Sequence, residues 1–246
     1  MAVAFLYITS KLRRFFLRKV KANETFSGEV TLIDVLLLFI LMITSKTTTE
    51  DLVKRRIVIF ASGNGTNAQN IIHHFQQSNL AEVVLVLSNK KNAQVLVRSK
   101  SLHVTSKHFT KEDLSSSEKV LEFIKEVRAD LIVLAGFLLK FPTHILSEYP
   151  GQVINLHPAL LPKYGGKGMY GQFVHEAVVA NKEKESGITI HYVNENYDEG
   201  AIIFQKSVEL SEEDTPETVA HKIHTLEYAY FPKVIEKLLL SKVNKT

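Results

Sequence analysis

The feature that most restricts the possible folds is a continuous apolar run. It is followed by glycines and then by a helical pattern. Ile57 to Ala61 are all apolar, which is typical of a strand buried on both faces of a parallel sheet. Ser62 to Asn67, reading SGNGTN, break this strand, and apolar residues then recur at helical spacing over 68–75. Similar apolar runs, Val83–Ser88 and Leu131–Phe137, alternate with further helical patterns. This alternation predicts an α/β fold: a mostly parallel twisted sheet with helices on both faces and a Rossmann-like N-terminal half.

The glycine-rich turn is also a candidate anion site. A strand, a turn and a helix N-terminus present free N–H groups and the positive end of the helix dipole, which favour phosphate. Gly65, Thr66 and Asn67 are the candidate ligands. The third glycine of the dinucleotide fingerprint G-x-G-x-x-G is missing, so we do not expect NAD. An ordinary strand-to-helix turn capped by Thr66 or Asn67 explains the segment equally well.

A second candidate site lies in the segment VINLHPALLPKY, residues 153–164. Asn155 and His157 are two residues apart, so they project to the same side of an extended chain. Pro158 ends the strand because proline has no N–H for the ladder. Ligands of α/β sheets usually bind at such strand ends. The simpler alternative is a turn-capping asparagine beside a surface histidine.

A strand with two different faces is predicted over residues 187–193. Ile188 and Ile190 lie on one face, and Thr189 and His191 lie on the other. This pattern indicates two different environments on the two sides of the strand.

Three other segments carry expectations. The loop 194–200 is acidic and holds Asp198, which gains a role only if the fold brings it beside the candidate histidine. Gly165–Gly171 has four glycines and is a candidate cover for a ligand, although a surface loop is its ordinary use. Thr215–Leu240 is predicted to form two helical stretches separated by Pro232.

Composition excludes several classes of protein. The chain has 246 residues, 45% of them hydrophobic and 23% charged, which is enough for a sizeable core. It has no cysteine, so a disulfide framework, a thiolate metal site and a cysteine nucleophile are excluded. Its histidines show no metal-ligand spacing, and we expect no metal. Residues 1–41 contribute +3 of the net charge of +4, so the remainder gives no reason to expect nucleic acid.

The N-terminal segment, residues 1–54, differs from the rest. It has a basic and aromatic run at Lys11–Lys21 and an apolar run at Thr31–Thr44 that includes Asp34. The apolar run is shorter than the roughly 18–20 residues that cross a bilayer, and a signal peptide fits poorly. We interpret the segment as an extension upstream of a start at Met42, with a short membrane anchor as the alternative.

Four segments together resemble the formyltransferase family that uses 10-formyltetrahydrofolate, over about residues 55–240. They are SGNGTN at Ser62–Asn67, LAGF at Leu134–Phe137, NLHPALLPKY at Asn155–Tyr164 and GITIHYVNENYDEG at Gly187–Gly200. The resemblance makes residues 55–246 the formyltransferase domain. It implies transfer of a formyl group from 10-formyltetrahydrofolate to the amine of 5-phosphoribosylglycinamide in purine biosynthesis, in the cytoplasm, on small-molecule substrates and without a membrane.

The resemblance also implies roles for individual residues. The family's asparagine, histidine and aspartate fall on Asn155, His157 and Asp198: the first two, with His157 protonated, would stabilise the oxyanion, and Asp198 would support His157. The residues implied for phosphate and ribose are Gly65, Thr66, Asn67, His224, Thr225, Leu226 and Glu227. Those implied for folate are Leu138, Leu139, Lys140, Phe141, Asn155, Asn194, Glu195, Asn196, Tyr197 and Asp198, with Lys111 as a candidate near the folate tail.

Departures from the family leave alternatives open. Family members often have Met-Arg-Ile-Leu where this chain has Leu138 to Phe141, and the loop Gly165–Gly171 is unusually rich in glycine. The alternatives are a formyltetrahydrofolate hydrolase, another folate-dependent formyltransferase such as the one that acts on methionyl-tRNA, or a non-catalytic nucleotide- or folate-binding protein. Retention of all three polar residues of the implied site speaks against the last.

Overall fold

The computed structural model describes residues 54–243. The predicted N-terminal extension, apart from Lys54, lies outside the described residues, as do Met42 and the apolar run. In the part of the chain that the structure describes, no helix is long and apolar enough to cross a membrane.

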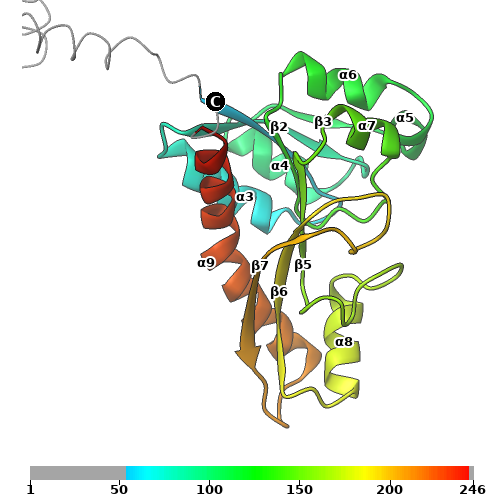
Figure 1. The fold of residues 1–246 in the computed structure, drawn as a ribbon, viewed down its shortest axis with the longest axis vertical. Coiled ribbons are helices and arrows are strands. Elements are labelled where there is room, and N and C mark those ends of the chain that lie inside the picture. Colours follow the sequence, from blue (N-terminus) through cyan, green and yellow to red (C-terminus); the bar gives the residue numbers. More distant parts are fainter. Residues whose placement is uncertain (1–53, 244–246) are drawn as a thin grey trace, which may run out of the picture. The chain divides into compact units, whose positions relative to one another are not determined.

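Seven strands form one sheet, in the order β3-β2-β1-β4-β5-β6-β7 (Figure 1). The first five of these strands run parallel, and the last two pairs are antiparallel. Their bounds are β1 Arg55–Phe60, β2 Ala81–Ser88, β3 Ser106–His108, β4 Leu131–Leu134, β5 Val153–His157, β6 Glu185–Tyr192 and β7 Ile202–Glu209. The predicted mostly parallel sheet is confirmed.

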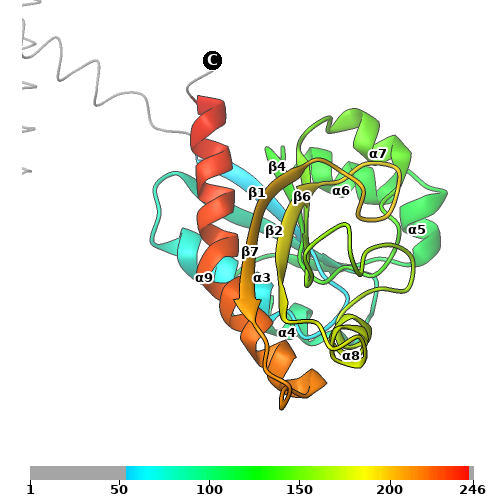
Figure 2. The same ribbon diagram turned by 60° about the horizontal axis from the view of Figure 1, so that its bottom comes forward.

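Helices cover both faces of this sheet, as predicted (Figures 1 and 2). The core on one face contains residues of α3, α4, α8 and α9, and the core on the other contains residues of α5, α6 and α7. Their bounds are α3 Thr66–Gln76, α4 Gln94–Ser101, α5 Lys111–Ser115, α6 Lys119–Glu126, α7 Thr143–Glu148, α8 Gln172–Ala180 and α9 Pro216–Val243.

The apolar run of β1 is continuous because the strand is buried on both sides. Ile57 and Ile59 belong to the core under α3 and α9, whereas Val58 and Phe60 belong to the core under α6 and α7. All four are fully buried. Successive side chains of a strand point to opposite faces, so a strand between two helical layers needs apolar residues at every position.

The prediction for the last segment was wrong. Pro232 does not separate two helices but lies inside the single helix α9, which has 28 residues. Proline removes one backbone hydrogen bond from a helix interior. Packing of Phe231, Ile235 and Leu239, all fully buried, keeps the helix continuous against the sheet.

The strand order reverses between β1 and β4, which are neighbours in the sheet although β2 and β3 separate them in sequence. At such a reversal the connections leave the two strands in opposite directions, and a crevice opens at their carboxyl ends. The loops after β1, β4 and β5 all begin at this edge.

Candidate functional site

A cavity of ≈ 640 Å³ lies at the carboxyl ends of β1, β4 and β5. It is lined by both of the polar segments singled out in the sequence and by the loop 194–198. The expected site residues that line it are Gly65, Thr66, Asn67, Leu138, Leu139, Lys140, Phe141, Asn155, His157, Asn194, Asn196, Tyr197, Asp198, His224 and Glu227. The fold thus brings together groups that are up to 162 positions apart in the chain, from Gly65 to Glu227.

The glycine-rich turn forms the first wall of this cavity. The N-cap of α3 is Gly65, not Thr66 or Asn67, and no side chain caps the helix. Gly65 has a φ of 77°, and a Cβ built on it would lie 2.3 Å from a side-chain atom of Val95. Glycine is therefore needed here both for the left-handed backbone and for the close approach to α4. Because Gly65 makes no side-chain cap hydrogen bond within the described residues, the first-turn N–H groups of α3 remain available to an anion.

Neighbouring side chains fix the shape of this turn. Arg98 of α4 donates from Nε to the Asn64 carbonyl over 3.0 Å and from Nη2 to the Asn64 amide oxygen over 3.2 Å. The buried Ser62 hydroxyl donates to Asn89 over 2.7 Å and accepts the N–H of Leu138 over 3.0 Å. Ser62 thereby ties the first wall to the loop after β4.

Asn67 and Glu227 join α3 to α9 at the same end of the cavity. The Asn67 amide donates to Oε2 of Glu227 over 2.7 Å, and His224 Nδ1 lies 2.8 Å from the same oxygen. Glu227 is only 5% exposed. The hydrogen bond to this carboxylate raises the pKa of His224 above its ordinary value, although partial burial opposes the effect.

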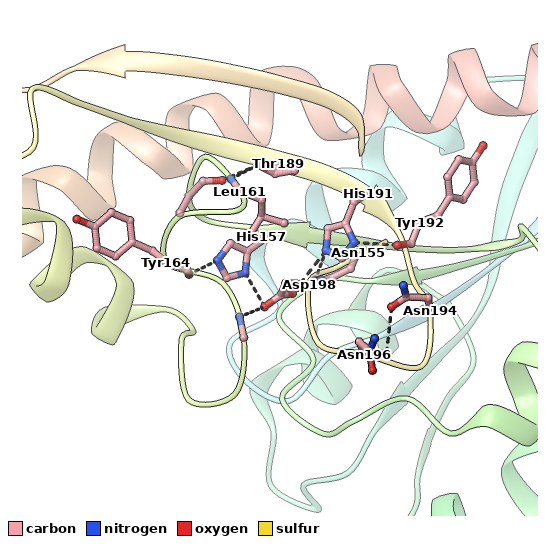
Figure 3. A network of polar contacts seen from close by, with 12 residues as sticks. Asn155, His157, Leu161, Tyr164, Thr189, His191, Tyr192, Asn194, Asn196 and Asp198 are labelled. Atoms are coloured by element: carbon pink, nitrogen blue, oxygen red, sulfur yellow. Dashed lines mark hydrogen bonds and ion pairs between the residues drawn. The ribbon is translucent and has the colours of Figure 1, made fainter. Parts of the chain in front are cut away.

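The pair Asn155 and His157 lies at the end of β5, beside Asp198 (Figure 3). His157 Nε2 donates to the Tyr164 carbonyl over 2.7 Å, and its Nδ1 is 3.5 Å from Oδ2 of Asp198. That same oxygen accepts the N–H of Gly166 over 3.0 Å. The expected proximity of the histidine and the aspartate is confirmed by these distances.

His191 is a further member of this cluster that the sequence did not assign to the site. It lies opposite Asn155 in the antiparallel pair of β5 and β6. The Asn155 amide donates to His191 Nε2 over 3.1 Å, while His191 Nδ1 donates to the Tyr192 carbonyl over 2.8 Å. The second contact of the Asn155 amide, with Oδ1 of Asp198, is longer at 3.4 Å. The polar face of residues 187–193 was the available signal.

Burial decides the protonation of this cluster. His157 is 3% exposed, and desolvation lowers its pKa below the ordinary 6.5, even though Asp198 and the Tyr164 carbonyl favour the charged form. The ring is therefore neutral at neutral pH in the free protein, whereas the protonated ring implied by the family resemblance belongs to the step in which the oxyanion forms. Burial alone would raise the pKa of Asp198, but His191, His157 and the N–H of Gly166 together hold it below its ordinary value.

The expected folate wall is only partly exposed to the cavity. Leu138 is 38% exposed, whereas Phe141 is 3% exposed and packs edge-to-face on Phe60 with ring centroids 5.2 Å apart. Leu139 packs on the same core. Two tyrosines of the lining are similarly exposed, Tyr170 at 41% and Tyr197 at 37%. Leu138, Tyr170 and Tyr197 are thus the large hydrophobic side chains of the lining that are most open to a flat ligand.

Four of the expected residues do not line the cavity: Lys111, Glu195, Thr225 and Leu226. Lys111 is exposed at the start of α5, and Glu195 is exposed on its loop. Thr225 donates to the His221 carbonyl, and Leu226 packs on the core. His224 and Glu227 share one helix face because they are three residues apart, and the two residues between them point elsewhere.

Residues 55–235 match the family model described as formyl transferase, and the chain belongs to this family. The chain is similar to the phosphoribosylglycinamide formyltransferase of Bacillus subtilis (strain 168), with 35% identity over 190 residues, 75% of this chain and 95% of the relative. It is 33% identical to the Haemophilus influenzae protein of the same name over 74% of this chain and 86% of that protein.

Solved structures give the same result. The phosphoribosylglycinamide formyltransferase of Bacillus halodurans has a TM-score of 0.68 and 35% identity, covering 75% of this chain and 95% of that one. The protein of that name from Anaplasma phagocytophilum has a TM-score of 0.70 and 28% identity, covering 77% and 89%. The family and its fold, expected from the four sequence segments, are thereby confirmed.

Proposed function

We propose that this protein transfers the formyl group of 10-formyltetrahydrofolate to the primary amine of 5-phosphoribosylglycinamide, a step of purine biosynthesis. One observation carries the proposal: a single cavity joins the uncapped N-terminus of α3 to the cluster of Asn155, His157 and Asp198. An anion site at one end and proton-handling groups at the other suit an amine that is tethered to a phosphate. The names of the relatives support the same substrate.

The reaction requires no covalent enzyme intermediate. The amine nitrogen attacks the formyl carbon, and negative charge develops on the formyl oxygen. The C–N bond to the folate nitrogen N10 then breaks, while one proton leaves the amine and one proton reaches N10. Chemistry of this kind is accelerated by a donor to the developing oxyanion and by a group that holds the proton in transit.

Asn155 is suited to the first task. One hydrogen of its amide is engaged by His191 over 3.1 Å, while the other makes only the 3.4 Å contact with Asp198. The longer contact is the weaker one, so the formyl oxygen can replace it. A preorganised donor of this type contributes about 2.7–4 kcal/mol to transition-state stabilisation.

His157 and Asp198 are suited to the second task. The Nε2–H of His157 is fixed on the Tyr164 carbonyl, so its lone pair lies on Nδ1 and faces the ionised Asp198. A proton that leaves the amine can be held at Nδ1, between the ring and the carboxylate. The imidazolium formed in this way would be stabilised by the charge of Asp198. This attraction offsets the cost of burying a charged ring, which keeps the ring neutral before the reaction.

The two substrates would occupy opposite ends of the cavity. The N–H groups of Gly65, Thr66 and Asn67 would bind the phosphate, and Glu227 would accept from the ribose hydroxyls. Folate would lie between Leu138 and the loop 194–198. Both ligands are anionic small molecules, and we infer that the enzyme works on them in the cytoplasm.

The test is to incubate the purified chain with both substrates and to detect the formylated ribonucleotide by mass spectrometry. A formyltetrahydrofolate hydrolase would instead release formate at the same rate with or without the ribonucleotide. A binding protein would form no product. Ribonucleotide-independent formate release, or the absence of product with both ligands bound, would overturn the proposal.

A further inference from the structure

The proline inside α9 leaves one backbone carbonyl without its helical donor, and this carbonyl has a partner on another helix. In an α-helix the N–H of each residue donates to the carbonyl four positions earlier, and proline has no N–H. Pro232 therefore deprives the carbonyl of Tyr228 of its donor. The side-chain amide of Asn70, on α3, donates to this same carbonyl over 3.0 Å. Asn70 thus supplies from α3 the hydrogen that Pro232 lacks.

A second contact joins the same two helices beside the first. The Asn67 amide donates to Oε2 of Glu227 over 2.7 Å. Asn67 lies three residues before Asn70, on the same side of α3, and Glu227 directly precedes Tyr228. Helices α3 and α9 cover the same face of the sheet (Figures 1 and 2). One hydrogen bond would leave α9 able to turn about its own axis, whereas two neighbouring bonds restrict this rotation.

The rotation of α9 determines which oxygen of Glu227 is open to a ligand. Oε2 is engaged by Asn67 and by His224 Nδ1, at 2.7 and 2.8 Å. Oε1 makes no hydrogen bond to a described residue, and it is not one of their fully buried unpartnered atoms. Because Glu227 lines the cavity, Oε1 is the oxygen that remains for a ligand. A turn of α9 relative to α3 would move this oxygen out of place.

We propose that Asn70 is a positioning residue for ribonucleotide binding. By replacing the N–H that Pro232 lacks, it holds α9 in the rotation at which Oε1 of Glu227 accepts from the ribose hydroxyls. This inference rests on the proposed function, in which Glu227 binds the ribose. Asn70 does not itself line the cavity, so a change at this residue should weaken ribonucleotide binding without altering the formyl-transfer step.

A double-mutant cycle between positions 70 and 232 tests the proposal by isothermal titration calorimetry without folate. Asn70→Leu removes the donor and keeps a side chain of similar size, so the ribonucleotide should bind about two- to tenfold more weakly, the equivalent of one hydrogen bond. Pro232→Ala gives the Tyr228 carbonyl a helical donor again. In the Pro232→Ala background, Asn70→Leu should therefore change the affinity by less than about twofold. Ribose 5-phosphate, which keeps the ribose contacts, should follow the same pattern.

Two further variants make the cycle specific. Asn70→Asp has the shape of asparagine, but its carboxylate cannot donate to a carbonyl. It should weaken binding at least as much as Asn70→Leu, and it replaces that variant if the leucine chain does not fold. The matched control is Gln77→Leu. Gln77 lines the groove between α3 and α9 as Asn70 does, but its side chain makes no hydrogen bond to a described residue, so binding should be unchanged.

Steady-state kinetics distinguish positioning from a general loss of stability. Asn70→Leu should raise the Michaelis constant for the ribonucleotide by the factor found in calorimetry. The Michaelis constant for 10-formyltetrahydrofolate and kcat should stay at their wild-type values. A chain that is merely less stable would have less active enzyme, so its apparent kcat would fall while both Michaelis constants stayed the same.

The outcomes separate this inference from the proposed function. If the wild-type chain formylates the ribonucleotide but Asn70→Leu leaves its affinity unchanged, Asn70 does not position α9. The same conclusion follows if Asn70→Leu weakens binding equally with and without Pro232→Ala, or if only kcat falls. If the wild-type chain neither binds nor formylates the ribonucleotide, the proposed function fails and this inference fails with it.

Discussion

Gly65→Ala is the change whose effect can be worked out most directly from the structure. The backbone φ of 77° is left-handed, which costs an L-residue about 1–2 kcal/mol. The new methyl group would also lie 2.3–2.7 Å from side-chain and backbone atoms of Val95. Val95 is fully buried and its backbone cannot move away freely, so overpacking adds about 1–3 kcal/mol.

The left-handed strain and the overpacking together cost about 2–5 kcal/mol. We expect part of this cost to appear as lower stability and part as weaker binding of the ribonucleotide. If the turn keeps its shape, the free energy of unfolding falls by this amount. If the N-terminus of α3 shifts to relieve the clash, stability falls less and the ribonucleotide binds more weakly. Each 1.4 kcal/mol of lost binding is about a tenfold rise in its Michaelis constant. The Michaelis constant for 10-formyltetrahydrofolate should change little.

Gly151→Ala is the matched control. Gly151 has a φ of 65°, but a Cβ at this position would have no described atom within 4 Å, and Gly151 does not line the cavity. This variant should show the left-handed strain of about 1–2 kcal/mol in urea unfolding without the clash, and its kinetics should be normal. The reasoning is refuted if the two alanine variants have the same stability and the same Michaelis constant for the ribonucleotide.

Three further predictions follow from the site and the chain. Asn155→Ala should lower kcat by about 10²–10³-fold while calorimetry shows unchanged ribonucleotide binding, since the lost donor acts on the transition state; near-normal turnover would contradict this role. Burial lowers the pKa of His157, so the unfolded chain binds a proton on this ring at a higher pH than the folded chain does, and the free energy of unfolding falls as pH drops from about 6.5 through the lowered pKa of the folded state. Urea unfolding between pH 7.5 and 5.5 should therefore show a smaller loss of stability for His157→Asn than for wild type, and equal losses would refute the assignment. A chain that begins at Met42 should fold and have the specific activity of the full chain, and mass spectrometry of the native protein should find its N-terminus there; insoluble or inactive protein would show that residues 1–41 are needed.

Local periodicity predicted the sheet well because a strand that is buried on both faces has apolar residues at consecutive positions. Every position of Val58 to Phe60 is apolar since successive residues enter different cores. The same reasoning placed the polar pair of β5 at a strand end. It failed at Pro232, where long-range packing of α9 outweighs the local loss of a hydrogen bond. Local rules cannot weigh contacts whose partners are distant in sequence.

The contact of His191 with Asn155 depends on strand register, which the sequence of either strand alone does not determine. In the antiparallel pair, Asn155 faces His191 and His157 faces Thr189. A slip by one residue would turn both members of β6 to the opposite face. The polar face of β6 was visible as an alternation, but its alignment with the polar face of β5 required the fold.

Helical phase explains why only half of the predicted ribose segment reaches the cavity. His224 and Glu227 are related by the spacing i and i+3 and meet at 2.8 Å, whereas Thr225 and Leu226 lie on other sides of α9. A family resemblance assigns a role to all residues of a matching segment. In a helix, however, only some of these residues point toward any one site.

The position of Asp198 shows how the antiparallel end of the sheet completes a site that a purely parallel sheet would leave open. β6 ends beside β5, and the loop that follows turns back so that Asp198 reaches both His157 and His191. The residue has a left-handed φ of 58°, a conformation that costs a non-glycine residue about 1–2 kcal/mol. The carboxylate accepts hydrogen bonds from the Gly166 N–H and, over a longer distance, from the Asn155 amide, and both offset this strain most strongly while the carboxylate is ionised. The charge that would stabilise the proton in transit is therefore the same charge that holds the loop over the cavity.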